Sequence, residues 1–199
     1  MLTSNKTSSL AIDTLRDRTL GQNMAVLGIY CDHDAQKEQS AVNLIGGLLR
    51  QAVWEPGGIR GEIQKAFTKS KMRGGQGLHL QDMLKLFVQV IGSIDRVYIC
   101  VDALDELLPT VRIELLQALR QIIRDTPDAR LFLTTRPYIR GELGRYLVKD
   151  PHTIKIVANQ GEIAIYLNHM MDNDRDPDLM TEDLREVIIE TILCKASEM

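Results

Sequence analysis

Short apolar runs recur along the chain and are separated by longer stretches with helical periodicity. Residues 23–32 ("NMAVLGIYCD"), 97–102 ("VYICVD") and 129–135 ("ARLFLTT") are strand-length apolar runs flanked by polar or turn-forming residues. Residues 152–158 ("HTIKIVA") alternate between polar and apolar side chains. Runs of this length and pattern predict four strands, and the first three are expected to be buried.

Apolar residues at intervals of three and four predict helices between and after these strands. The predicted helices lie within residues 39–54, 55–77, 78–94, 110–127, 138–148, 161–171 and 184–196. Pro109 opens the fourth of them, and an acidic linker at 172–183 precedes the last. Because strands that alternate with helices are joined by right-handed crossovers, we expect an α/β protein whose parallel sheet is covered by helices on both faces.

The composition indicates one ordinary intracellular domain plus a fragment, without a general affinity for nucleic acid. The chain has 199 residues, 44% of them hydrophobic, and a formal net charge of −3 from 24 basic and 27 acidic residues. Its three cysteines lack CxxC spacing and its four histidines lack metal-ligand spacing, which argues against a disulfide framework and a zinc site. No segment has the apolar length of a signal peptide or a membrane span, so we expect a cytoplasmic location and no membrane partner.

Three acidic residues follow the second predicted strand, namely Asp102, Asp105 and Glu106 in "VYICVDALDEL". A charge at the end of a buried strand is unfavourable unless it is solvated, paired or bound to a metal ion. Asp102 is therefore a candidate for orienting Mg²⁺, as in P-loop NTPases, while Asp105 or Glu106 is a candidate for orienting or deprotonating an attacking water. The alternative is that Asp102 caps the following helix.

Polar groups also follow the third predicted strand, where "LFLTTR" ends in Thr134, Thr135 and Arg136. Two hydroxyls and a guanidinium can sense or neutralise a terminal phosphate, although an isolated arginine is more often part of a surface ion pair. Ligands of parallel sheets bind at the carboxyl ends of the strands. We therefore expect the acids and the Thr–Arg group to lie side by side at one edge of the sheet.

The segments "YCDHDAQKEQSAVNLIGGLLRQAV", "RVYICVDALDEL" and "RLFLTTRP" resemble the NACHT-type, nephrocystin-like N-terminal NTPase domains of large fungal signal-transduction ATPases. The resemblance implies a partial NTPase domain at residues 1–170, with a three-layer α/β/α parallel sheet, and a linker and first helix of a helical region at 171–199. It implies Asp102 as the Mg²⁺ ligand, and Asp105, Glu106 and Arg136 as catalytic residues. ATP or GTP would be the nucleotide, with Thr135 among its contacts.

The phosphate loop that such a domain requires is incomplete in this sequence. The pattern GxxxxGK[ST] lets backbone N–H groups wrap the phosphates while the lysine neutralises them. In the nearest match, "MLTSNKT", Lys6 and Thr7 fit, but Asn5 replaces the second glycine and the first would precede Met1. In a second register Met1 is the first residue beyond the loop and "NKTSS" is an insertion. A further alternative is that Lys6 and Thr7 belong to a polar stretch before a helix.

Both registers lack the loop's glycines and the strand before it, so we expect a domain truncated at or just after the Walker A loop. In the family that strand lies between the strands of "LFLTT" and "TIKIV". Its absence would leave unpaired backbone groups on both neighbours. We therefore expect a poorly stable, aggregation-prone chain unless the gap closes.

Two functions are consistent with these features. The first is part of a nucleotide-dependent signal-transduction switch of the NACHT and STAND class, using Mg²⁺ and ATP or GTP, with weak or no hydrolysis because the phosphate loop is incomplete. The second is a catalytically inactive module for protein interaction or dimerisation. Under either hypothesis we expect protein partners or self-association and no nucleic-acid partner. Nucleotide binding separates the two.

Overall fold

The computed structural model describes residues 3–54, 79–149, 151–156, 159–173 and 180–197. The chain divides into two compact units, Met1–Pro151 and His152–Met199. The helix predicted within 55–77 lies outside the described residues. No helix in the described part of the chain is long and apolar enough to cross a membrane.

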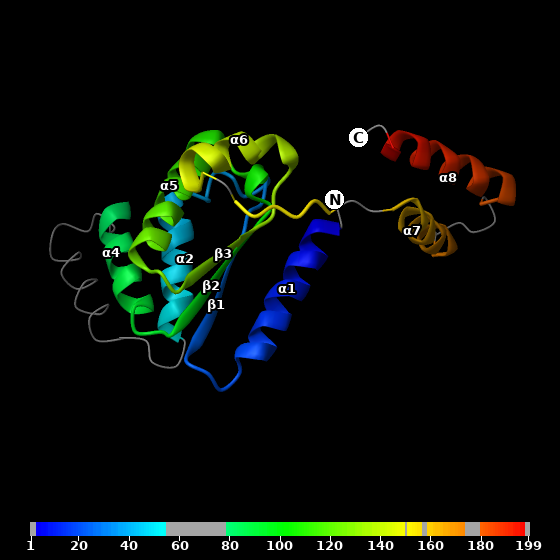
Figure 1. Ribbon diagram of the computed structural model, residues 1–199. Coiled ribbons are helices and arrows are strands. Elements are labelled where there is room, and N and C mark those ends of the chain that lie inside the picture. Colours follow the sequence, from blue (N-terminus) through cyan, green and yellow to red (C-terminus); the bar gives the residue numbers. More distant parts are fainter. Residues whose placement is uncertain (1–2, 55–78, 150, 157–158, 174–179, 198–199) are drawn as a thin grey trace. The chain divides into compact units, whose positions relative to one another are not determined.

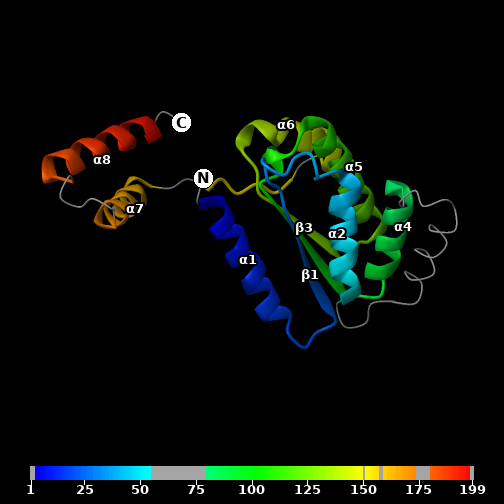
Figure 2. The ribbon, with the colours of Figure 1, turned by 180° about the vertical axis from the view of Figure 1, so that it is seen from behind.

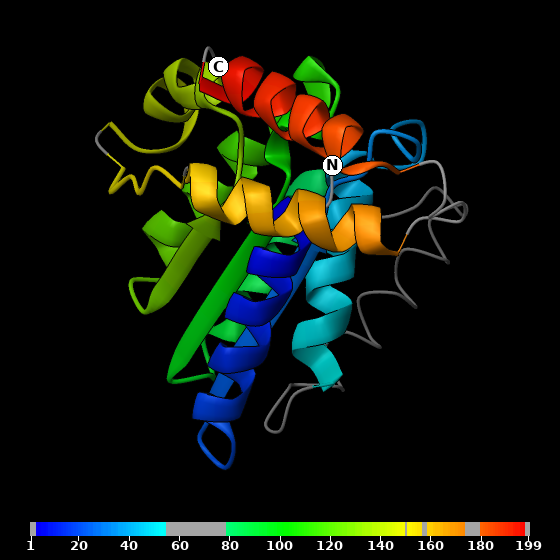
Figure 3. The same ribbon diagram turned by 90° about the vertical axis from the view of Figure 1, so that its right-hand side faces the viewer.

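Three parallel strands form the sheet of the first unit. They are β1 (Met24–Tyr30), β2 (Arg96–Asp102) and β3 (Ala129–Leu133), in the spatial order β1-β2-β3. Met24 pairs with Arg96 at the start of β1, and Val97 pairs with Ala129 at the start of β3. These strands confirm the first three predicted from the sequence and the α/β class, and Figure 3 shows β3 as the outermost strand on its side of the sheet.

Helices α2 (Ala41–Trp54), α4 (Leu80–Ile91) and α5 (Pro109–Asp125) cover one face of the sheet (Figure 1). Successive strand residues point to opposite faces, so Leu27 and Ile99 belong to this side. The helices contribute an apolar stripe each, which confirms the periodicity seen in the sequence. The fully buried side chains of this core include Ile45, Leu48, Leu84, Phe87, Ile91, Leu115, Leu116 and Leu119.

Helix α1 (Thr3–Thr19) covers the opposite face of the sheet (Figure 2). Its Ile12 is buried against Val26 of β1 and Cys100 of β2. α1 runs down the sheet and β1 runs back up it, so the amino-terminal end of α1 lies at the end of the sheet where the strands finish (Figure 1). Helices thus lie on both faces, as the α/β/α prediction requires.

Short helical turns follow β3. η2 (Pro137–Ile139), α6 (Arg140–Glu142) and the π-helical segment η3 (Leu143–Leu147) run on without a break, and Ile139 and Leu147 are buried in the main core. They confirm the helix predicted at 138–148. η3 packs against α5, which fixes the segment after β3 to the helical layer.

The strand predicted at 152–158 is wrong over its described part. Residues 152–156 have no regular secondary structure, and Ile154 and Ile156 expose 74% and 72% of their surface. An alternating pattern supplies side chains for a strand but not the hydrogen-bonded neighbour that a strand needs. Among the described strands, β3 has β2 as its one neighbour.

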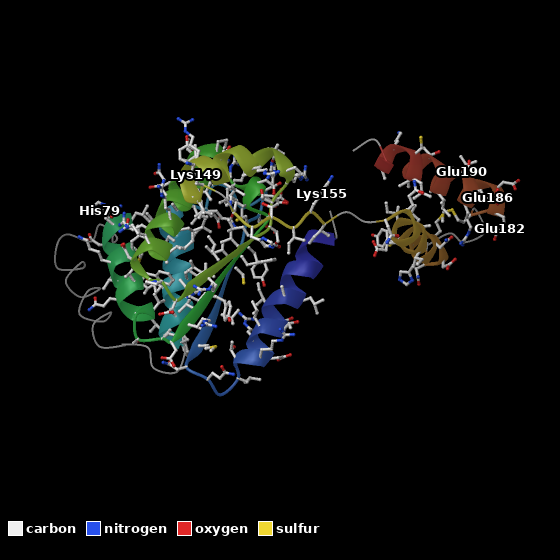
Figure 4. All side chains as sticks on the ribbon, in the orientation of Figure 1. His79, Lys149, Lys155, Glu182, Glu186 and Glu190 are labelled. Atoms are coloured by element: carbon white, nitrogen blue, oxygen red, sulfur yellow. The ribbon has the colours of Figure 1, made fainter. Side chains whose placement is uncertain are left out.

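The second unit consists of α7 (Gln160–Asp172) and α8 (Glu182–Ser197), which confirm the last two predicted helices. Asn159 and Glu162 form a capping box at the start of α7, with N···O distances of 2.9 and 3.0 Å. Figure 4 shows Glu182, Glu186 and Glu190, whose four-residue spacing places them along one face of α8. The domain boundary predicted between residues 170 and 171 falls inside α7 and stays a prediction.

Candidate functional site

The carboxyl ends of β2 and β3 meet at one edge of the sheet, here called the rim. Asp102, the last residue of β2, is 2% exposed, and its Oδ1 accepts a hydrogen bond from the hydroxyl of Thr134. The same hydroxyl oxygen accepts the backbone N–H of Ala103 at 2.9 Å. The structure therefore confirms that the acid and the threonine group lie side by side.

The turn after β2 presents the other two acids. Ala103 has φ 53° and ψ 45°, a left-handed conformation that L-residues other than glycine seldom adopt. Two hydrogen bonds to Thr134 hold this turn in place. The backbone N–H of Ala103 donates to the Thr134 hydroxyl, and the backbone N–H of Leu104 donates to the Thr134 carbonyl at 3.0 Å. The short helix η1 (Leu104–Glu106) follows and carries Asp105 and Glu106.

Asp105 is bound to the residues that follow β3. Its Oδ1 accepts the backbone N–H of Arg136 at 3.0 Å and lies 3.4 Å from the Thr135 hydroxyl. Its Oδ2 lies 3.3 Å from Nε of Arg136 in an ion pair in which the aspartate side chain is 7% exposed and the arginine 62%. The predicted catalytic acid and the predicted phosphate sensor therefore neutralise each other in this structure.

Glu106 is bound to the loop after β1 instead. Its Oε2 accepts the backbone N–H of His33 at 3.1 Å, and its own backbone carbonyl accepts from Nε2 of Gln36 at 2.6 Å. The turn bearing the acids is consequently fixed on one side to the loop after β1 and on the other to the segment after β3.

Burial and nearby negative charge both favour the neutral form of the Cys31 thiol at the rim. Burial, with smaller contributions from the charges of Asp102, Glu106 and Asp105, raises the pKa of the Cys31 thiol to about 12. Cys31 directly follows β1, and its backbone N–H donates to the Asp102 carbonyl at 3.0 Å. A thiol in this environment stays protonated at neutral pH and is a poor nucleophile.

The carboxylate of Asp102 is the kind of ligand that a protein supplies to Mg²⁺. Protein sites for Mg²⁺ commonly supply one or two carboxylates and leave the remaining positions to water and substrate phosphates. In the described part of the chain, no group of three or more His, Cys, Asp or Glu side chains could hold a metal by itself. Any metal at the rim would therefore depend on phosphate oxygens as well as on Asp102.

Lys6 and Thr7 lie in the first turns of α1, within a helix rather than before one. Because the amino-terminal end of α1 lies at the same end of the sheet as the rim, its backbone N–H groups and helix dipole are placed where an anion would be favoured. The side chains of these two residues are outside the described set, and their predicted contact with phosphate stays a prediction.

The helix-cap alternative for Asp102 is wrong. Neither η1 nor α5 has a side-chain cap, because their N-cap positions are Ala103 and Leu108. The Asp102 carboxylate instead accepts a hydrogen bond from Thr134, which directly follows the neighbouring strand β3.

Sequence reasoning missed an ion pair behind the rim in which the arginine is buried and the glutamate half-buried. Arg112 of α5 is 5% exposed, and its guanidinium makes two bonds to Glu142 of α6, at 2.7 and 2.9 Å. Its Nη1 also donates to the carbonyls of Leu107, at 2.9 Å, and Asp105, at 3.5 Å. The hydrogen bond between the pair raises the pKa of Arg112 and lowers the pKa of Glu142. One sequence feature could have indicated this burial. Arg112 lies three residues before Leu115, and this spacing places it on the apolar face of α5.

Comparison with known proteins supports the fold. The sequence model of the family described as "Nephrocystin 3, N-terminal" matches residues 6–136. No curated protein matches the chain significantly. Among solved structures, the Orc1 protein of Aeropyrum pernix, determined in complex with DNA, aligns with a TM-score of 0.54 and 13% identity over 85% of this chain and 42% of the Orc1 chain. At that identity the likeness shows the fold alone, which is of the P-loop NTPase type.

Proposed function

This chain belongs to the nephrocystin 3 N-terminal family, and on that basis we propose that it is part of a nucleotide-dependent signal-transduction switch of the NACHT and STAND class. Mg²⁺ with ATP or GTP would bind at the rim, and hydrolysis would be weak or absent. The observation that carries the proposal is the position of Asp102 and Asp105 at the end of β2 beside Thr134, Thr135 and Arg136 at the end of β3.

Each rim residue has a role in this proposal. Asp102 holds Mg²⁺, which would neutralise charge on the phosphates. Arg136 is 62% exposed and can exchange its carboxylate partner for a terminal phosphate, which would release Asp105 to orient water together with Glu106. The Asp105–Arg136 ion pair is then the resting arrangement of the switch. The Thr135 hydroxyl lies next to Asp105, so it would stay near this carboxylate both in the resting arrangement and with nucleotide bound.

Hydrolysis is expected to be weak because the phosphate cradle is incomplete. Asn5 stands where the nearest match to the phosphate-loop pattern needs a glycine. A side chain at that position crowds the close approach of backbone N–H groups to phosphate. Lys6, Thr7 and the amino-terminal end of α1 would supply the remaining positive potential.

Calorimetric titration of the protein with ATP and with GTP, each with Mg²⁺, tests this proposal. We expect binding in the micromolar range that is weakened at least tenfold by Asp102→Asn and by Lys6→Ala. Asp82→Asn, an exposed aspartate on α4, is the matched control and should bind like the wild type. Absence of binding at millimolar nucleotide would refute the nucleotide function, and equal binding by all variants would refute the rim as its site.

A second candidate function is protein interaction or dimerisation without nucleotide. The observation that favours it is the exposure of Phe132, which is 39% exposed on β3, an outer strand among those that the structure describes. Self-association measured in the absence of nucleotide separates this candidate from the first.

A further inference from the structure

The outer edge of β1 is built from every second residue of the strand. In a β-strand, the N–H and C=O of successive residues point alternately towards one neighbour and towards the other. The N–H of Cys31 donates to Asp102 and the carbonyl of Asn23 accepts from Asp95, each at 3.0 Å, so the odd-numbered residues face β2. The residues that direct their backbone groups away from the sheet are therefore Met24, Val26, Gly28 and Tyr30.

Side chains cover the second half of this edge. The side-chain amide of Gln51 accepts the N–H of Gly28 at 2.8 Å and donates to its carbonyl at 2.9 Å. Gln39 donates to the carbonyl of Tyr30 at 3.0 Å. These contacts take the place of a neighbouring strand, which is one way in which proteins prevent edge-to-edge pairing.

The first half of the edge has no such cover. No described residue makes a hydrogen bond to the outward N–H and C=O groups of Met24 and Val26. Val26 is 4% exposed, and a backbone group shielded from water without a partner is unfavourable. An added chain could satisfy these groups, and Gln51 would end its pairing at Gly28.

A pocket of about 210 Å³ lies at this uncovered part of the edge, lined by Arg16, Val26, Arg50, Gln51 and Trp54. Because α1 and α2 lie on either side of β1 (Figure 2), the pocket receives one arginine from each face of the sheet. Its volume is below the roughly 300–1,000 Å³ of pockets that enclose a whole small ligand. The size therefore favours one or two residues of a longer chain over a free cofactor.

The two arginines lack strong partners within the described part of the chain. Arg16 lies 4.0 Å from Asp13 in an exposed pair, and no described acid lies within 4.0 Å of Arg50. A cation in the last turn of a helix is favoured by the helix dipole, which accounts for Arg16 on α1. Arg50 precedes the last turn of α2, so the dipole does not account for it. Both guanidiniums are available to bind carboxylates.

We propose that this pocket binds an extended segment of a partner protein that carries two consecutive acidic residues. The segment adds to the edge of β1 at Met24 and Val26, so that backbone hydrogen bonds supply affinity and the pocket supplies specificity. Successive side chains of a strand point to opposite faces of the sheet. One carboxylate therefore lies beside Arg16 on the α1 face and the other beside Arg50 on the α2 face.

The inference rests on the second candidate function, to which it gives a surface and a ligand, and it does not depend on nucleotide binding. The site also contains its own reporter. Trp54 is the one tryptophan of the chain, is 78% exposed and lines the pocket. A bound segment covers part of its indole ring, so binding should change the tryptophan fluorescence without any added label.

Fluorescence titration with hexapeptides, acetylated and amidated at their ends, is the primary test. The peptide TVEEVT should bind saturably and at least tenfold more tightly than TVQQVT, which has the same shape without the charge. TVEQVT and TVQEVT should fall between them. Raising the NaCl concentration from about 0.05 to about 0.5 M should weaken the binding of TVEEVT, because salt screens exposed ion pairs.

Arginine variants identify which carboxylate each guanidinium binds. Arg16→Gln and Arg50→Gln should each weaken the binding of TVEEVT about tenfold. Arg18→Gln is the matched control, because it removes an exposed arginine of α1 that does not line the pocket. Replacing one glutamate of the peptide should cost nothing further in one arginine variant, and replacing the other glutamate should cost nothing further in the other variant. A folding defect cannot produce this reciprocal pattern, and its absence would overturn the placement of the carboxylates on two faces.

A modified peptide tests the strand addition separately from the charge. Methylation of both glutamate amide nitrogens of TVEEVT removes the donors that would pair with the edge of β1, and binding should be lost. A methylated peptide that binds as tightly as TVEEVT would show attraction of carboxylates alone and would overturn the strand addition.

The failure of this inference can be distinguished from the failure of the proposed functions. If neither fluorescence nor calorimetry detects binding of TVEEVT at millimolar concentration, the inference is wrong. Self-association of the wild type without nucleotide would then still support the second candidate function. The titration with Mg²⁺ and nucleotide tests the first function independently of this site.

Discussion

Asp105 and Arg136, which follow neighbouring strands, are joined at both the backbone and the side chain. The backbone N–H of Arg136 donates to Oδ1 of Asp105 at 3.0 Å, and its Nε lies 3.3 Å from Oδ2. The aspartate side chain is 7% exposed and the arginine 62%. The buried carboxylate therefore organises the rim, while the exposed guanidinium is free to exchange partners.

This asymmetry predicts unequal costs of substitution. Asp105→Ala removes the acceptor of a backbone N–H and of the Thr135 hydroxyl, and we expect it to lower the free energy of unfolding by about 2 kcal/mol. Arg136→Gln removes the exposed half of the pair and should cost less than about 1 kcal/mol. Urea unfolding of both variants measures the difference. Equal losses would show that the ion pair, rather than the backbone bond, holds the rim together.

The Arg112–Glu142 pair should contribute more to stability than any exposed pair on the same helix. Arg112→Ala leaves Glu142 and the carbonyl of Leu107 without their donor, and we expect a loss of about 3 kcal/mol in the free energy of unfolding. Arg124→Ala is the matched control, because Arg124 pairs with Asp125 on α5 with 72% of its side chain exposed. It should change stability by less than about 0.5 kcal/mol. Comparable losses in both variants would contradict the burial argument.

The buried thiols should make the protein less stable at alkaline pH. Burial, assisted by neighbouring carboxylates, raises the pKa of Cys31 to about 12, and burial raises that of Cys100 to about 11. An unfolded thiol ionises near pH 8.5. Above that pH the unfolded state loses protons that the folded state retains, so the free energy of unfolding falls by up to about 1.4 kcal/mol per pH unit for each thiol.

Urea unfolding at pH 7, 9 and 10 checks this expectation. Cys31→Ala should reduce the decline between pH 9 and 10, whereas Cys194→Ala, which removes an exposed thiol, should not. A decline identical in all three proteins would assign the pH dependence to other groups.

The Gln51 side chain should protect the β1 edge. Gln51→Leu removes both bonds to Gly28, and we expect a loss of about 1–2 kcal/mol in the free energy of unfolding. Gln51→Glu can accept the Gly28 N–H but sets a carboxylate oxygen against the Gly28 carbonyl, so its loss should be at least as large. Gln81→Ala, at an exposed position of α4, is the control for a surface glutamine. A Gln51→Leu protein as stable as the wild type would show that water replaces the side chain at this edge.

The sequence predicted the rim because two kinds of information coincided there. Apolar runs located β2 and β3, and the first charged or hydroxyl residues after them marked where each strand ends. In a parallel sheet those ends share one edge, so Asp102 and Thr134 had to be close. Their roles in binding nucleotide follow from the family resemblance, not from this geometry.

Other contacts left little or no trace in the sequence. Gln51 and Gly28 are 23 positions apart and Arg112 and Glu142 are 30 apart, and only folding brings each pair together. The strand predicted at 152–158 failed for the converse reason. Its alternating pattern is genuine, but residues 152–156 pair with none of the strands in the described part of the chain.

The sequence by itself determined the described helices from α2 onward and three of the strands, because periodicity and strand-end polarity are local properties, whereas α1 was not predicted. Only the tertiary structure decided which side chains complete the β1 edge and which acid is neutralised by Arg136. These features depend on contacts between distant residues and on the presence of a neighbour for every strand. Local sequence cannot encode a hydrogen-bond partner that lies elsewhere in the fold.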